Sequence, residues 1–166
     1  MKNLFALTLS IAFAYFLTGY LSNSLLAIDG YAVAAWPPSG IALASILLSR
    51  NRALPGVLLG AFLVNLIHLD KVTDILHWQV MLQAIGVTAA STFQAWLAYY
   101  IIIHVVKRPL ELSSLKQSVQ GLIIGGPLCS LIAASTGTAL LVINNVIPSY
   151  AALNNFIAWW IGDSIG

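Results

Sequence analysis

The chain has 166 residues, of which 60% are hydrophobic and only 7% charged, and its formal net charge is +2. Soluble domains carry about 25% Asp, Glu, Lys and Arg, so this composition excludes a water-soluble enzyme, a disordered chain and a nucleic-acid-binding protein. The apolar runs are continuous and too long for the alternating strands of a barrel. We therefore expect an all-α, polytopic transmembrane bundle of about six helices.

The first predicted helix covers about residues 4–27 and follows a single charged residue, Lys2. Its apolar stretch runs from Leu4 to Ile28 without a charge, which is longer than the apolar region of a typical signal peptide. This length is enough to span a bilayer, so an uncleaved transmembrane helix is expected to end near Asp29.

The second predicted helix covers about residues 31–49 and contains Trp36, Pro37, Pro38, Ser39 and Gly40 in succession. Two consecutive prolines remove two backbone donors, so the helix must break or restart at this point. A restart at Pro37 would leave N–H groups near Ser39 and Gly40 free to face a cavity or a partner helix. A kink that serves packing alone is the alternative.

The third predicted helix covers about residues 54–69 and carries Gly56 and Gly60 at a spacing of four, with Asn65 deeper in the helix. The fifth predicted helix, about residues 117–143, repeats this spacing with Gly121 and Gly125. Small residues at this spacing let transmembrane helices cross closely, so these four glycines are predicted to serve packing. Asn65 is expected to hydrogen-bond between helices.

Two histidines and two aspartates surround the connection between the third helix and the fourth, which covers about residues 75–106: His68, Asp70, Asp74 and His77. These side chains could bind a divalent metal or respond to pH. Their spacing matches no standard metal site, and a loop exposed to water explains them more simply. No metal and no cofactor is therefore predicted.

Asp163 is the only acidic residue inside an apolar segment, because the sixth predicted helix starts between Ser149 and Phe156 and continues to Gly166. Carboxylates inside a membrane are costly and indicate function by default, and Trp159 lies one turn away on the same helical face. If this helix starts near Asn155, Asp163 should meet the broken turn at Trp36–Gly40 at a similar depth. A carboxylate near the membrane interface is the alternative.

The last five residues, Gly162–Gly166, match the G-x-S-x-G pattern of serine hydrolases. That pattern needs a strand–turn–helix context and a histidine later in the chain, and no residue follows Gly166 in this sequence. A lone cysteine, Cys129, excludes an internal disulfide and is expected to serve packing. The chain is therefore not predicted to be an enzyme.

Positive charges gather on one side of the predicted helices. With the N-terminus in the cytoplasm, that side holds six of the seven cations, and the opposite side holds one cation and three aspartates. The six cations are Lys2, Arg50, Arg52, Lys107, Arg108 and Lys116. We therefore expect a multi-pass protein of the bacterial cytoplasmic membrane, a single domain over residues 1–166, with both termini cytoplasmic.

Three stretches together resemble the first class of bacterial membrane-associated sensor (MASE) domains. They are WPPSGIALA at residues 36–44, PGVLLGAFLVNL at residues 55–66 and WWIGDSIG at residues 159–166. The resemblance implies an integral-membrane input domain placed before a cytoplasmic histidine kinase, GGDEF or EAL module. It thus implies a role in two-component or cyclic di-GMP signalling, with the cytoplasmic output domain as partner.

Two features depart from the pattern that the resemblance implies. Relatives usually have further helices after the Gly-Asp motif, which suggests that the chain is truncated at its C-terminus. Gln94 stands where relatives often carry Glu, which removes a charge that could pair with an intramembrane cation. Gln94 therefore joins Asn65, Trp159, Asp163 and the turn at residues 36–40 as a candidate for binding a ligand or sensing a signal.

The leading functional expectation is thus a sensory domain without catalysis of its own. The alternative is a small six-helix transport component, such as the substrate-capture subunit of an energy-coupling importer. Those subunits often present Ala-x-x-x-Ala on the first helix, but Ala6 and Ala14 here are followed after four residues by Ser10 and Thr18. The expected partner is the lipid bilayer. The sequence leaves open whether the chain also associates as a homodimer or with another membrane protein.

Overall fold

In the computed structural model, the described residues are 2–26, 33, 35–72, 77–106 and 115–166. For residues 2, 3, 69–72 and 77, only the backbone is described. Asp29 and Asp74 of the sequence predictions lie outside the described residues, as do the side chains of Asp70 and His77.

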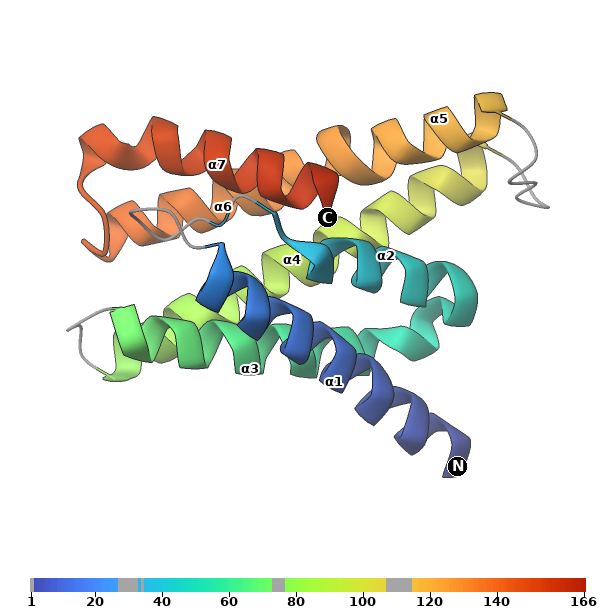
Figure 1. The fold of residues 1–166 in the computed structure, drawn as a ribbon, viewed down its shortest axis with the longest axis horizontal. Helices are drawn as coiled ribbons and strands as arrows, with labels where there is room; N and C mark the ends of the chain where they lie inside the picture. The colour runs from blue at the N-terminus through green and yellow to red at the C-terminus, as the bar shows by residue number, and fades with distance from the viewer. Residues whose placement is uncertain (1, 27–32, 34, 73–76, 107–114) are drawn as a thin grey trace.

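The described residues form a helical bundle, which confirms the predicted all-α class, whereas the expected count of about six helices is not confirmed (Figure 1). The α-helices are α1 (Lys2–Leu25), α2 (Pro37–Ser49), α3 (Leu54–Val72), α4 (His77–Val105), α5 (Leu115–Ile123), α6 (Cys129–Ile143) and α7 (Ala152–Ile165). Three shorter helical segments join them: η1 (Arg50–Ala53), the π-helical η2 (Ile124–Leu128) and η3 (Ser149–Ala151).

Helix α2 begins at Pro37, and Ala35 and Trp36 before it are not helical. The expected start near residue 31 was therefore too early, while the expected restart at Pro37 is present. Proline suits the first turn of a helix, where its missing N–H has no partner to lose. It also biases the preceding residue towards extended backbone, which explains why Trp36 stays outside the helix.

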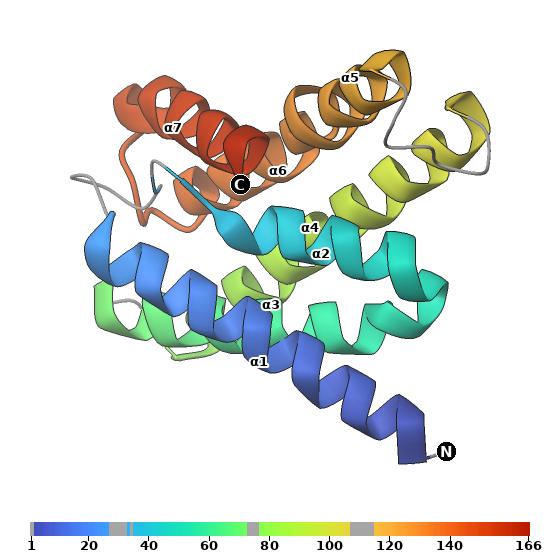
Figure 2. The same ribbon diagram turned by 45° about the vertical axis from the view of Figure 1, so that its right-hand side comes forward.

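Helices α2 and α3 form a hairpin that turns at η1, as Figures 1 and 2 show. Arg50 makes the turn with a φ of 56°, in the left-handed region. By length and composition, four helical runs in the described part could cross a membrane: Leu4–Leu25, Pro37–His68, Trp78–Val105 and Leu115–Ile143. The second run contains the η1 turn and so comprises both arms of the hairpin. These runs support a multi-pass membrane protein.

The fifth predicted helix is present as one helical run, Leu115–Ile143, but the π-helical segment η2 interrupts its α-helical geometry between α5 and α6. Pro127 lies inside η2. A proline removes one backbone hydrogen bond and clashes with the carbonyl one turn earlier, and a wider π turn accommodates both effects. Leu115 and Lys116, expected in a loop, instead open α5.

Helices α1 and α3 cross closely at the two glycines of α3. A Cβ added to Gly60 would lie 2.7 Å from Tyr15 Cβ and 2.8 Å from the Ala12 carbonyl oxygen, and Gly56 faces Thr8 in the same way. In contrast, nothing described lies within 4 Å of such an atom on Gly121. The close crossing expected at Gly121 is therefore absent from the described part, because the short α5 buries none of its residues.

Gly125 lies in η2 and receives the Leu43 side chain of α2 rather than the backbone of another helix. The main core joins α1, α2, α3 and α4 around Tyr15, Ile46 and Val57. The outer faces carry large exposed apolar side chains such as Phe5 and Phe13. Such faces suit lipid, where every backbone polar group is already bonded within its helix.

Candidate functional site

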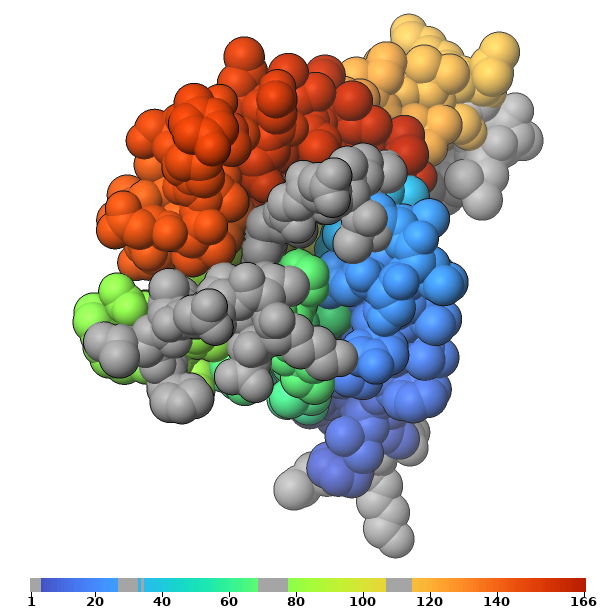
Figure 3. Space-filling model, turned by 60° about the vertical axis from the view of Figure 1, so that its left-hand side comes forward, coloured from blue at the N-terminus to red at the C-terminus, as the bar shows by residue number. Residues whose placement is uncertain are grey.

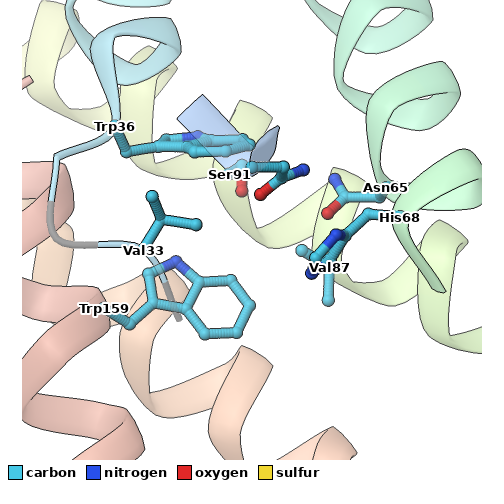
Figure 4. Close-up of a pocket in the computed structure, with 8 residues that line it drawn as sticks. Val33, Trp36, Asn65, His68, Val87, Ser91 and Trp159 are labelled. Carbon is cyan, nitrogen blue, oxygen red and sulfur yellow. The ribbon is translucent and has the colours of Figure 1, made fainter. Parts of the chain in front are cut away.

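A small, partly open cavity lies where α1, α3, α4, α7 and the chain before α2 converge. Its lining combines polar side chains with two indole rings (Figure 4): Asn23, Val33, Trp36, Asn65, His68, Val87, Ser91 and Trp159. The cavity measures about 30 Å³. A water needs about 10–15 Å³ on this measure, so the space suits a few waters or a ligand of similar size.

The two indole rings enter the cavity from segments far apart in sequence (Figure 4). Trp36 comes from the chain before α2, and Trp159 comes from α7. Trp159 packs its ring directly against Gly137 of α6, where any side chain would occupy the same space. In Figure 3, α7 (red) and α1 (blue) are both visible on one face of the molecule.

The end of α7 is bonded to the beginning of α2. The Trp36 N–H donates to the Gly162 carbonyl over 3.0 Å. The Ser39 hydroxyl lies between two carbonyl acceptors, that of Trp36 at 2.9 Å and that of Asp163 at 3.0 Å. The backbones of Gly40 and Gly166 are in direct contact. The predicted approach of Asp163 to the segment Trp36–Gly40 is therefore present.

The expectation of free backbone N–H groups at this turn is wrong for Ser39. Its N–H donates to the Trp36 carbonyl over 3.1 Å, because the first turn of α2 tightens around Trp36. The Asp163 side chain instead points towards α4, where Gln94 Nε2 donates to Asp163 Oδ2 over 3.3 Å.

Gln94 connects three helices. Its Nε2 donates to Asp163 of α7, while its Oε1 accepts the backbone N–H of Ala133 in α6 over 3.3 Å. Asp163 and Gln94 are each only 4% exposed. Asp163 Oδ1 is buried without a hydrogen-bond partner among the described residues. The Trp159 side chain is the other hydrogen-bonding group beside this carboxylate. Burying a carboxylate is costly, which makes Asp163 a candidate functional group.

Tyr15 connects the Asp163 carboxylate to the cavity. Its hydroxyl accepts the indole N–H of Trp36, hydrogen-bonds Ser91 and lies within electrostatic range of Asp163. Trp36 and Ser91 both line the cavity. We call Asp163, Gln94, Ser39 and Tyr15 the Asp163 cluster.

Further polar contacts fix α7 on α6 and η2. Asn155 Nδ2 donates to Thr138 Oγ1 over 2.9 Å, and the hydroxyls of Ser130 and Ser164 are 2.9 Å apart. The Trp160 indole N–H donates to the Pro127 carbonyl over 2.7 Å. Helix α7 thus has a defined register against both α2 and α6, which positions Trp159 and Asp163 together.

Among the four outer-loop candidates for metal binding, only His68 has a described side chain. His68 lines the cavity, whereas Asp70, Asp74 and His77 lie outside the described side chains. Within the described part, no group of three or more His, Cys, Asp or Glu side chains could hold a metal ion. Asn65 also lines the cavity, and its Nδ2 donates to Ala61 O in the same helix over 2.8 Å.

The sequence reasoning missed Tyr15, Asn23, Val87 and Ser91. A signal was present for Ser91, because it opens a polar interruption of the apolar α4 that continues to Gln94. Asn23 is likewise a polar residue near the end of an apolar helix. Tyr15 and Val87 carry no such signal, since apolar and aromatic residues occupy every face of their helices.

Comparisons with known proteins complete the description of the site. A search of curated proteins and a search of solved structures found no match. The MASE1 family model matches residues 5–166, which is essentially the whole chain and includes the cavity and the Asp163 cluster. The chain therefore belongs to the MASE1 family of membrane-associated sensor domains.

Proposed function

We propose that this chain is the sensory input domain of a bacterial signalling protein, has no catalytic activity of its own and controls a cytoplasmic histidine kinase or cyclic di-GMP module in the full-length protein. The observation that carries the proposal is the position of Trp159, which lines the cavity one helical turn before Asp163. A change in cavity occupancy would therefore act directly on the helix whose register the Asp163 cluster holds.

These contacts indicate how a molecule in the cavity would act on α7. A small polar molecule that fills the cavity would meet the polar side chains of Asn65 and Ser91 as well as the two indole rings (Figure 4). Because Trp36 is bonded to both Tyr15 and Gly162, its displacement would loosen α7 from α2. A ligand shifts such an equilibrium only by its difference in affinity between the two arrangements.

The test replaces one cavity wall in the full-length protein. Trp159→Ala should change the basal output activity or abolish the response to the signal at unchanged membrane levels, because it opens the cavity and frees α7. Trp78→Ala is the matched control, since Trp78 is 60% exposed on α4 and lines no part of the cavity. Equal output from both variants and the wild type would refute the proposal.

We further propose that the protein lies in the cytoplasmic membrane with its N-terminus and the η1 turn on the cytoplasmic side. In Figure 1 the start of α1, the η1 turn and the start of α5 lie at the same end of the bundle. Arg50, Arg52 and Lys116, the three cations with described side chains, belong to that end. This grouping supports the positive-inside orientation.

Cysteine labelling tests this orientation. Asn51→Cys should resist an impermeant thiol reagent in intact cells, whereas Ser149→Cys, before α7 at the opposite end, should react. Both positions are exposed, and the native Cys129 is only 2% exposed, so background labelling should be low. Reaction at position 51 with protection at position 149 would reverse the proposed topology.

A further inference from the structure

A second hollow lies where α2 turns into α3, and it shares no residue with the cavity. It opens between α1, α2, η1 and α4 and measures about 630 Å³. That volume lies within the range of about 300–1,000 Å³ that is typical of small-molecule sites. Its lining consists of Leu7, Leu48, Ser49, Arg50, Asn51, Arg52 and Tyr99.

The hollow concentrates positive charge without a described counter-charge. Arg50 and Arg52 are exposed two residues apart in η1. The only carboxylate among the described side chains belongs to Asp163, which is buried in the Asp163 cluster. Arg50 also adopts a φ of 56°, which is unfavourable for a residue with a side chain and fixes the backbone of the turn.

The apolar part of the lining distinguishes a lipid from a soluble anion. Leu48 is 86% exposed at the end of α2, and Leu7 of α1 borders the same hollow. A soluble phosphate would gain nothing from either leucine, whereas an acyl chain would cover them. Leu7 lies near the start of the candidate span Leu4–Leu25 and Tyr99 near the end of Trp78–Val105, which places the hollow at the depth where headgroups are found.

We propose that this hollow binds the headgroup of an anionic phospholipid. The guanidinium groups of Arg50 and Arg52 would hold the phosphodiester, since guanidinium matches phosphate geometry with paired N–H donors. Ser49 and Asn51 would donate to the remaining headgroup oxygens, and Leu7 and Leu48 would contact the first part of an acyl chain. A bound lipid would thus join α1 to the α2–α3 hairpin.

Native mass spectrometry of the purified chain tests the proposal, with phosphatidylglycerol, phosphatidylcholine and inorganic phosphate as probes. The wild type should retain phosphatidylglycerol at least about tenfold better than phosphatidylcholine, and the preference should fall with salt. The double variant R50Q/R52Q should lose that preference, by about fivefold for each arginine. Lys116→Gln, which removes an exposed cation outside the hollow, should retain it.

Three results would overturn the proposal. The first is equal retention of the two lipids by the wild type, a measurement that does not depend on how the variants fold. The second is a loss with Lys116→Gln as large as the loss with R50Q/R52Q. The third is competition by inorganic phosphate as strong as that by phosphatidylglycerol, which would assign the hollow to a soluble anion.

Discussion

In the full-length protein, Asp163→Leu is expected to abolish regulated output while membrane insertion stays normal. Leucine cannot accept the N–H of Gln94, so a buried amide 4% exposed would be left without its partner. An unsatisfied buried donor costs about 1–3 kcal/mol, which is enough to change the register of α7. The measurement is kinase or cyclase output at equal membrane levels.

Asp163→Asn separates the charge from the shape of the side chain. Asparagine fills the same space and its Oδ1 can still accept the Gln94 N–H, but an NH2 donor replaces the second carboxylate oxygen, so output should change without a loss of folding. Asn154→Leu is the matched control, because Asn154 is exposed on the same helix. Wild-type output from both Asp163 variants would show that this carboxylate has no role in signalling, as expected for a side chain near the membrane interface.

Gln94 offers a second check on the same contact. If Asp163 and Gln94 act as one unit, Gln94→Leu should add little to the effect of Asp163→Leu. Independent roles would give additive effects. Because Gln94 also accepts the backbone N–H of Ala133, Gln94→Leu removes a contact with α6 as well.

The membrane class and bundle could be predicted because composition alone leaves few charged groups to face water. Residues near the site could also be predicted where they interrupt an apolar run, as Trp36, Pro37 and Asp163 do. The lining from α1 and α4 could not, since an apolar helix in lipid has no polar face to indicate which side points inward. Tyr15 and Val87 are the clearest examples.

The predicted depth of the site rested on a helical segment before Pro37, rising about 1.5 Å per residue. Extended chain advances about 3.3 Å per residue, and Trp36 is not helical. Helix α7 begins at Ala152, earlier than the start near Asn155 that the prediction required. The two regions still meet, since the Trp36 N–H donates to the Gly162 carbonyl. Pro127 likewise predicts an irregular helix from the sequence. The packing around η2 determines that this irregularity is a π turn.

The second large expected effect comes from packing rather than from a polar group. Gly60→Ala should lower the free energy of unfolding of the purified chain by about 1–3 kcal/mol and so lower its midpoint of thermal unfolding. The reason is that the added carbon would meet the backbone of Ala12 and the Cβ of Tyr15. Neither neighbour can rotate away, so α1 and α3 must separate. Tyr15 is 1% exposed and bonded to Trp36, and the separation should therefore also shift output in the full-length protein.

Gly121→Ala gives the matched control for the sign of this effect. Alanine is favoured over glycine in a helix by about 1 kcal/mol, and nothing described lies within 4 Å of the new carbon at Gly121. Gly121→Ala should therefore leave the midpoint of thermal unfolding unchanged or raise it, and leave output unchanged. Since both substitutions add the same methyl group to a helix, opposite directions would isolate the α1–α3 crossing as the cause. An unchanged or higher midpoint for Gly60→Ala would show that this crossing does not hold Tyr15 in place.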